Sequence, residues 1–505
     1  MCAQSFDDSI EQNHANAIEK ATAGVTFGHW IDGKTVPASS GKWFETSDPA
    51  VGKPIADVAQ GRRGDIVDAV SAARSAFDTT WGETTPRERA TVVREWVGDL
   101  REHTEELALL ESLDTGKPLA HAREEIEDAF EYLEYYVSVA QAHEGSHLPY
   151  GSDNHVYIRN EPYGVAGQIL PWNYPLNLFG WKVGAALAAG NTVVCKPSEE
   201  APLSITRAVQ LSANTLPDGV LNVVNGYGTE AGAPLTEHAD VDKLSFTGSV
   251  PVGKQVMRAA AEHVTPVTLE LGGKSPFIVF PDADIEQAAE TSAAGIFYNA
   301  GQSCDACSRL LVHEAVREEF TDAFLDAAGM WEPGDPLADG TKMGPLTFAE
   351  QHEKVADYVA TGKAEGATLI KGGQEPGGGP AAGQFMQPTV FDDVDNDMRI
   401  AQEEIFGPVQ TIIGFSDYAE AIELANDIDY GLAAGVATSD AATAHRAAAD
   451  IQAGSIWINE YHGGGPGIPF GGFKSSGIGR ECAKEALDEY THTKSVNIAL
   501  DDPQV

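Results

Sequence analysis

Two cysteines stand three positions apart in the segment NAGQSCDACSR, at Cys304 and Cys307. A C-x-x-C pair is typical of a thiol–disulfide redox site or of half a zinc site. A zinc site needs four ligands, usually two such pairs, and the cysteines at 2, 195 and 482 are isolated. A thioredoxin-like protein is much smaller and places its pair after the first strand. The pattern therefore favours a cysteine nucleophile or cysteines that pack in a core.

A carboxylate and an amide stand in two other informative segments. Glu270 lies in the apolar segment VTLELGG, where burying an unpaired carboxylate would be costly. That position favours a functional carboxylate over an ordinary surface residue. Asn173 lies in the segment Asn-Tyr-Pro, which by itself predicts only a bend in the chain.

Short apolar segments alternate with helical segments from about residue 160. GVAGQIL, NTVVCKP and DKLSFTG read as buried strands, and APLSITRAVQLSANT (residues 201–215) reads as a helix between them. This alternation predicts a parallel sheet with helices on both faces, and ligands of such sheets bind beyond the carboxyl ends of the strands. A second alternation after about Gly272 predicts a second α/β domain.

Two glycine-rich segments are close to known functional motifs, but each lacks a residue or a second motif that the function requires. GSVPVGKQ (residues 248–255) is close to a phosphate-binding loop, but Gln255 stands where a serine or threonine would bind magnesium. HGGG (residues 462–465) is typical of esterase oxyanion loops, but the chain has no G-x-S-x-G nucleophile motif. We therefore expect residues 462–465 to form a glycine-rich loop near a pocket.

The charge balance is strongly acidic. The 505 residues include 33 Lys and Arg against 76 Asp and Glu, a formal net charge of −43, while 42% of the residues are hydrophobic. The acidic residues are spread along a chain that is apolar enough to fold, which predicts a solvated acidic surface. Because concentrated salt screens the repulsion on such a surface, we expect adaptation to high cytoplasmic salt. Binding to nucleic acid or to an anionic membrane is disfavoured.

Cysteine usage and the N-terminal segment predict a cytoplasmic protein. Five scattered cysteines form no disulfide framework, and MCAQSFDDSIEQ is too polar and acidic for a signal peptide. The longest apolar stretch, NLFGWKVGAALAAG, contains a lysine and is too short to span a bilayer.

Seven segments occur together in one order: PWNYPL, KPSE, FTGS, LELGGKSP, FYNAGQSCDACSR, EEIFGPV and PFGGFKSSGIGRE. In this order they resemble the signature blocks of the aldehyde dehydrogenase superfamily, and the resemblance covers roughly residues 25–500. It implies an α/β fold with two doubly wound Rossmann-like domains and a small β oligomerisation flap. It also implies NAD(P)-dependent oxidation of an aldehyde to a carboxylic acid.

The resemblance implies a role for each catalytic residue. Cys304, the cysteine of the family's G-Q-x-C, would attack the aldehyde as a thiolate. The side-chain amide of Asn173 and the backbone N–H of Cys304 would hold the oxyanion of the thiohemiacetal. Glu270 would activate the water that hydrolyses the thioester, and its presence favours a free acid over an acyl-CoA product. Lys182 and Glu481 would form a proton relay near Glu270, or simply an ion pair.

The resemblance also implies the cofactor site. Lys196 and Glu199 would contact the adenosine ribose, where a carboxylate repels a ribose phosphate and so favours NAD over NADP. Gly248 and Ser249, at the start of a helix, would meet the pyrophosphate. The implied cofactor contacts are Ile169, Pro171, Trp172, Lys196, Glu199, Gly228, Phe246, Gly248, Ser249, Leu271, Glu404 and Phe406, and no metal site is expected.

The implied substrate residues leave two alternatives open. Four of the seven are aromatic and one is acidic, which suits a cage for the cation of betaine aldehyde or another aminoaldehyde. An ordinary apolar tunnel for aliphatic or aromatic aldehydes explains the same residues. The residues expected in this tunnel are Tyr174, Leu178, Trp181, Tyr298, Ser303, Asp305 and Phe470.

The expected domains follow from the same resemblance. Residues 22–136 and 160–271 would form the NAD-binding domain, 272–472 the catalytic domain, and 137–159 with 486–499 the flap that makes a homodimer or homotetramer. Two other classes remain as alternatives: a non-catalytic structural or stress member of the superfamily, and a thiol-redox protein that uses both Cys304 and Cys307.

Overall fold

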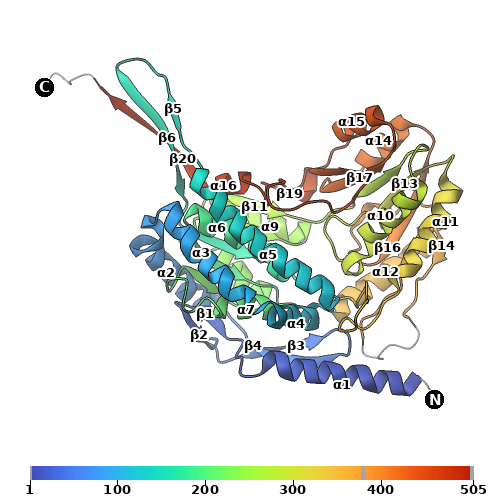
Figure 1. Cartoon of the computed structure of the whole chain (residues 1–505), viewed down its shortest axis with the longest axis horizontal. Helices are drawn as coiled ribbons and strands as arrows, with labels where there is room; N and C mark the ends of the chain where they lie inside the picture. Colours follow the sequence, from blue (N-terminus) through green and yellow to red (C-terminus); the bar gives the residue numbers. More distant parts are fainter. Residues whose placement is uncertain (1–2, 377–382, 501–505) are drawn as a thin grey trace.

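Most of the chain folds around two sheets, and the computed structural model describes residues 3–376 and 383–500 (Figure 1). The first sheet has eight strands in the order β19-β11-β10-β7-β8-β9-β1-β2. Its five central strands, β11, β10, β7, β8 and β9, are parallel. β19 and β1 pair antiparallel with the two ends of this group, and β2 pairs antiparallel with β1. The strands are β1 (His29–Ile31), β2 (Lys34–Val36), β7 (Val165–Ile169), β8 (Thr192–Lys196), β9 (Leu221–Val223), β10 (Lys243–Thr247), β11 (Val267–Glu270) and β19 (Gly477–Ile478).

Helices cover this sheet on both faces. Nearly every residue of α6 (Pro175–Ala189) is buried, as expected for a helix that is apolar on all sides. The helix α5 packs along it, so that the first sheet carries two layers of helices on this face (Figure 1). The other helices are α2 (Arg63–Thr79), α3 (Pro86–Arg101), α4 (Thr104–Thr115), α5 (Leu119–Val139), α7 (Leu203–Gln210), α8 (Ala233–Thr236), α9 (Val250–Ala261) and α16 (Glu485–Glu489).

The second sheet has seven strands in the order β14-β15-β16-β13-β12-β17-β18. All pairs except β14–β15 are parallel. The strands are β12 (Pro276–Val279), β13 (Arg309–His313), β14 (Thr368–Lys371), β15 (Thr389–Asp392), β16 (Val409–Phe415), β17 (Ala433–Ala437) and β18 (Ser455–Ile458). Its helices are α10 (Ile285–Phe297), α11 (Arg317–Ala328), α12 (Ala349–Glu365), α13 (Arg399–Gln402), α14 (Tyr418–Asn426) and α15 (Ala441–Asp450).

Three further elements lie outside the two sheets. A three-stranded antiparallel sheet of β5 (Ser146–Leu148), β6 (Asn154–Pro162) and β20 (Thr491–Ala499) projects away from the body of the molecule (Figure 1). A hairpin of β3 (Trp43–Asp48) and β4 (Lys53–Ala59) and the helix α1 (Ala3–Thr22) lie along the opposite side (Figure 1).

The predicted fold class is confirmed, with one correction to a helix. The helix expected over residues 201–215 is too long, because α7 ends at Gln210 and residues 211–215 form turns. The domain boundaries remain a prediction, although the change from the first to the second sheet falls between β11 and β12. Within the described ranges, no helix is both long and apolar enough to cross a membrane.

Candidate active site

The carboxyl ends of the parallel strands of the first sheet bring the predicted cofactor residues together. Ile169 pairs with Lys196 and with Phe246 at the ends of β7, β8 and β10, and Thr247 pairs with Glu270 at the end of β11. Ligands of parallel α/β sheets bind beyond this edge. Phe246 and Leu271 pack in the apolar layer beneath it, and Pro171 is buried at the same edge.

Glu199 is held beside Lys196 at this edge. The Lys196 Nζ donates to Glu199 Oε2 across 2.5 Å, and the backbone N–H of Gly228 donates to Glu199 Oε1 across 3.0 Å. Burial opposes the charge of Glu199, but Lys196 and the Gly228 N–H outweigh it and lower the pKa of that carboxyl. The result is an ammonium and a carboxylate in fixed positions, a donor set that fits the two hydroxyls of a ribose.

The first turn of α9 suits an anion. Ser249 is its N-cap residue, yet its hydroxyl makes no capping hydrogen bond. The free N–H groups of a helix start, together with the helix dipole, attract a phosphate. The backbone N–H of Gly248 donates to the carbonyl oxygen of Glu270 across 3.0 Å, which ties this turn to β11.

Aromatic side chains and Glu404 lie on the side of this edge that faces the second sheet. The Trp172 and Phe406 rings stand edge to face with centroids 5.2 Å apart, and Phe406 has a positive φ of 62°. The Glu404 Oε1 accepts from the backbone N–H of Gly273 across 3.1 Å. These residues come from segments more than 230 positions apart, and the fold brings them to one site.

Cys304 lies in the wall of one large cavity. The cavity has a volume of about 830 Å³, and its wall contains every residue predicted for the substrate tunnel: Tyr174, Leu178, Trp181, Tyr298, Ser303, Asp305 and Phe470. The Tyr174 hydroxyl donates to Ser303 Oγ across 3.1 Å, and Ser303 Oγ donates to Asp305 Oδ1 across 2.6 Å. The cavity opens onto the thiol, so an aldehyde in it would meet Cys304.

The two cysteines of the C-x-x-C pair have different environments. Cys304 is partly exposed, whereas Cys307 is fully buried and its thiol donates to the carbonyl oxygen of Ser292 across 3.3 Å. Burial, then the charges of Asp305, Glu270 and Glu404, raise the pKa of the Cys304 thiol well above its usual value. Cys304 therefore needs a base to become a thiolate. Cys2 lies outside the described residues.

Glu270 is a buried carboxylate without a hydrogen-bond partner. Its side chain is 4% exposed, and neither carboxylate oxygen has a partner among the described residues. Burial, and then repulsion from Glu481, raise the pKa of Glu270 well above its usual value, which Lys182 partly counteracts. An unpartnered buried carboxylate is costly unless water or a ligand meets it.

Lys182 forms an ion pair with Glu481, the simpler of the two alternatives for these residues, and the proton relay stays a prediction. Its Nζ donates to Glu481 Oε1 across 2.5 Å and to Ser245 Oγ across 3.1 Å, and all three side chains are buried. The pair lies close enough to Glu270 for both charges to act on that carboxyl.

Comparison with known proteins identifies the family. The aldehyde dehydrogenase family model matches residues 35–496. The chain belongs to the aldehyde dehydrogenase family. It is 46% identical over 477 residues to a mitochondrial benzaldehyde dehydrogenase of Antirrhinum majus, a match that covers 94% of this chain and 89% of the relative.

Two solved relatives have the same fold as this aldehyde dehydrogenase. An NAD+ complex of a Bacillus cereus aldehyde dehydrogenase superposes with a TM-score of 0.93 at 45% identity, covering 95% of this chain and 98% of the other. An NAD+ complex of a Staphylococcus aureus betaine aldehyde dehydrogenase gives 0.95 at 39% identity, covering 97% and 98%. The predicted class of enzyme, an NAD-dependent aldehyde dehydrogenase, is confirmed.

About half of the residues in the cavity wall were not predicted from the sequence. The loop at residues 462–465 lines the cavity, as predicted, but the acidic and aromatic residues of α5, of β18 and of the segment after β18 were not expected there. Periodicity along α5 shows which residues are buried, and it cannot show that others face a cavity formed with the second sheet. The acidic and aromatic residues that were missed are Glu125, Asp128, Glu131, Tyr132, Trp457, Glu460 and Tyr461.

Proposed function

We propose that this NAD-dependent enzyme oxidises aldehydes through Cys304, with Asn173 and Glu270 as its partners. The observation that carries the assignment is the cavity, whose wall joins Cys304 to all seven residues expected around the substrate. The thiolate sulfur of Cys304 adds to the aldehyde carbon, and the oxyanion accepts from the Asn173 amide and the Cys304 backbone N–H. Bound NAD supplies the hydride acceptor, and the donor set around Lys196, Glu199 and Ser249 fits its ribose and pyrophosphate.

Glu270 provides the base for hydrolysis. As a carboxylate it removes a proton from water, which then attacks the thioester carbon and releases Cys304 and the acid. Neither of its oxygens has a hydrogen-bond partner among the described residues, so both can accept from that water. A direct test is NADH formation by wild type and Cys304→Ala. Turnover that survives in the variant would refute the assignment of Cys304, whereas a wild type that turns over no aldehyde would favour a structural or thiol-redox protein.

We favour a cationic aldehyde as the substrate. Among the described residues, the cavity wall contains no lysine or arginine, but it contains seven aromatic side chains and five carboxylates: Glu125, Asp128, Glu131, Asp305 and Glu460. Three of these, Asp128, Glu131 and Glu460, belong to exposed residues, where they can meet a substrate cation in water. Aromatic faces and carboxylates both attract an alkylammonium group.

Two aldehydes of equal shape test this preference. Betaine aldehyde and 3,3-dimethylbutanal differ in one atom, a quaternary nitrogen in place of a carbon. We expect kcat/KM to favour betaine aldehyde, and Asp128→Asn, Glu131→Gln and Glu460→Gln to reduce that ratio. Asp326→Asn, an exposed carboxylate on α11, is the matched control. Equal kcat/KM values in wild type would instead favour the apolar tunnel.

Three further properties remain proposals. The acidic composition supports adaptation to concentrated salt, which predicts maximal activity and stability at molar KCl. The projecting sheet exposes Leu148, Tyr150 and Ile498, which supports a homodimer or homotetramer formed through it. Light scattering after size-exclusion chromatography measures that state. A cytoplasmic location also remains a prediction, and the Antirrhinum relative is described as mitochondrial.

A further inference from the structure

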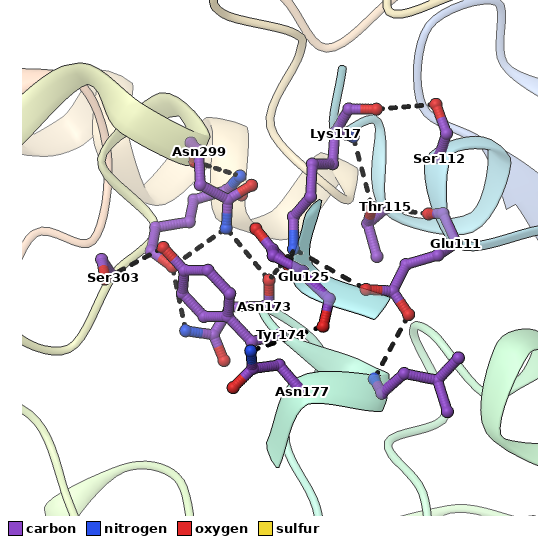
Figure 2. A network of polar contacts seen from close by, with 12 residues as sticks. Glu111, Ser112, Thr115, Lys117, Glu125, Asn173, Tyr174, Asn177, Asn299 and Ser303 are labelled. Carbon is purple, nitrogen blue, oxygen red and sulfur yellow. Dashed lines mark hydrogen bonds and ion pairs between the residues drawn. The ribbon is translucent and has the colours of Figure 1, made fainter. Parts of the chain in front are cut away.

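Lys117 is a fully buried lysine that neither the cofactor site nor the proposed chemistry uses. It lies between α4 and α5 and is 2% exposed. Its Nζ forms an ion pair with Glu125 and donates to the backbone carbonyl oxygen of Asn173 across 3.0 Å (Figure 2). A second buried carboxylate, Glu111, lies 3.9 Å away. The ammonium is therefore directed at the main chain of Asn173.

The ion pair extends to the wall of the substrate cavity. The Lys117 Nζ stands 4.3 Å from the centre of the Tyr174 ring, and the Tyr298 hydroxyl donates to Glu125 Oε1 across 3.2 Å. Glu125, Tyr174 and Tyr298 all line the cavity. Lys117 therefore contacts both the main chain of Asn173 and two residues of the cavity wall, Glu125 and Tyr174.

Asn173 is fixed at both its main chain and its side chain. Its carbonyl oxygen accepts from Lys117 and also from the Asn299 side chain, across 3.0 Å (Figure 2). Its own amide donates to the carbonyl oxygen of Gln302 across 2.9 Å. Asn299 has a positive φ of 50°, so the loop that carries Cys304 is held in an unusual conformation where it meets Asn173.

We propose that Lys117 is a positioning residue for the oxyanion, acting through Asn173, and that Glu125 holds Lys117 in place. The inference rests on the oxyanion role proposed for Asn173. A buried ion pair often contributes little net stability compared with an apolar pair of similar size. The hydrogen bond from Lys117 to the carbonyl oxygen of Asn173 instead fixes the position of Asn173. A misplacement of about 1 Å in an active site costs up to roughly 100-fold in rate.

A double-mutant cycle on the full-length enzyme tests the proposal. Lys117→Met, Asn173→Ala and the double variant are assayed for kcat, for KM of NAD and for melting temperature, with betaine aldehyde or benzaldehyde, whichever turns over faster. We expect Lys117→Met to lower kcat about 10- to 100-fold and to leave the KM of NAD unchanged. In the Asn173→Ala background, Lys117→Met should lower kcat almost no further, because Lys117 acts on the oxyanion through the Asn173 side chain, which that variant already lacks.

The outcomes separate this inference from the proposed function. Losses that multiply in the double variant overturn the inference alone, because Lys117 would then act independently of Asn173. An unchanged kcat in Asn173→Ala overturns the oxyanion role and the inference together. If Lys117→Met does not fold, Glu125→Gln replaces it in the cycle. We expect Glu125→Gln to lower kcat less than Lys117→Met does, and to lower it almost no further in the Asn173→Ala background. Losses of kcat that multiply in the double variant would again overturn the inference.

Arg89→Met is the matched control. Arg89 is also a buried cation, and it donates to the backbone carbonyl oxygens of Ala188 and Thr84 across 3.0 and 2.5 Å. Its bond to Ala188 holds the C-terminal end of α6, the end that is remote from Asn173. We expect this variant to melt at a lower temperature while its kcat stays within about twofold of wild type. A kcat loss as large as that of Lys117→Met would show that any buried cation has this effect, and would overturn the inference.

Discussion

The side-chain amide of Asn173 donates to the carbonyl oxygen of Gln302, two residues before Cys304, across 2.9 Å. An amide nitrogen carries two hydrogens. One is committed to Gln302, which fixes the plane of the amide, and the second remains for another acceptor. The same contact ties the segment before α6 to the loop that follows α10, so the oxyanion donor and the nucleophile keep their relative position.

The first prediction concerns Asn173. Asn173→Ala should lower kcat by about 100- to 1,000-fold, because one oxyanion donor is lost. Asn173→Asp should be at least as slow, since a carboxylate of the same shape repels an oxyanion. Steady-state NADH formation measures both variants, and the KM of NAD should not change. Activity within a few fold of wild type would contradict the assignment.

The second prediction separates the two cysteines. Cys304→Ala should abolish aldehyde oxidation, whereas Cys307→Ala should retain it, because the Cys307 thiol is buried and engaged with Ser292. NADH formation and thiol labelling with and without NAD measure the difference. If hydrogen peroxide inactivates wild type reversibly but inactivates Cys307→Ala irreversibly, the pair forms a protective disulfide. Identical behaviour leaves Cys307 a packing residue.

The third prediction concerns pH. Glu270 must be a carboxylate to activate water, and burial together with Glu481 raises its pKa. The rate of thioester hydrolysis should therefore rise with pH through the Glu270 pKa. Glu481→Gln removes the repulsion and leaves Lys182 unpaired, so the inflection should move to lower pH. Glu270→Gln should remove the dependence, and single-turnover rates across the pH range measure it. An inflection that Glu481→Gln leaves in place would rule out this coupling.

The fourth prediction concerns the choice of cofactor. Glu199→Gln removes the carboxylate that would repel a ribose phosphate and keeps the shape of the side chain. The ratio of kcat/KM for NADP over NAD should rise roughly tenfold or more, which corresponds to about 1.4 kcal/mol. Glu237→Gln, an exposed carboxylate paired with Arg63, is the control and should leave the ratio unchanged. A ratio that does not move in Glu199→Gln would place cofactor selection elsewhere.

The fifth prediction concerns stability. The buried His14 imidazole forms hydrogen bonds with the carboxylates of Asp48, across 2.5 Å, and Asp335, across 2.9 Å. These bonds join α1 to two distant segments of the chain. Burial lowers its pKa, but the bonds to Asp335 and Asp48 outweigh this and raise it from 6.5 to about 9. The stabilisation is fully present below pH 6.5 and is lost as pH rises through 9.

His14→Gln tests this account of stability. The variant should be less stable by up to about 3 kcal/mol at pH 6 and by much less at pH 10. Chemical denaturation at the two pH values, at constant salt, measures the difference. A loss of stability that is equal at both pH values would mean that the charge of His14 contributes nothing.

Local patterns and motifs along the chain were sufficient to predict the class of fold and the class of reaction. The alternation of short apolar strands and helices depends on local patterns, so the central strands of both sheets could be predicted. The family blocks occupy fixed positions along the chain, and they predicted roles for Cys304 and Glu270 and the seven residues that line the cavity beside Cys304. A carboxylate such as Glu270 is conspicuous in an apolar strand, because burying a carboxylate without a partner is costly.

The pairing of residues far apart in the sequence could be seen only in the folded chain. Lys117 contacts Asn173 across 56 positions, and Lys182 contacts Glu481 across 299. No local pattern encodes such pairs, because each depends on the order of strands in a sheet and on which helix faces meet. The same holds for the acidic wall of the cavity. From the sequence, Asp128 and Glu131 are expected to be solvent-facing residues of a helix, and they became part of the cavity wall only when the second sheet packed opposite them.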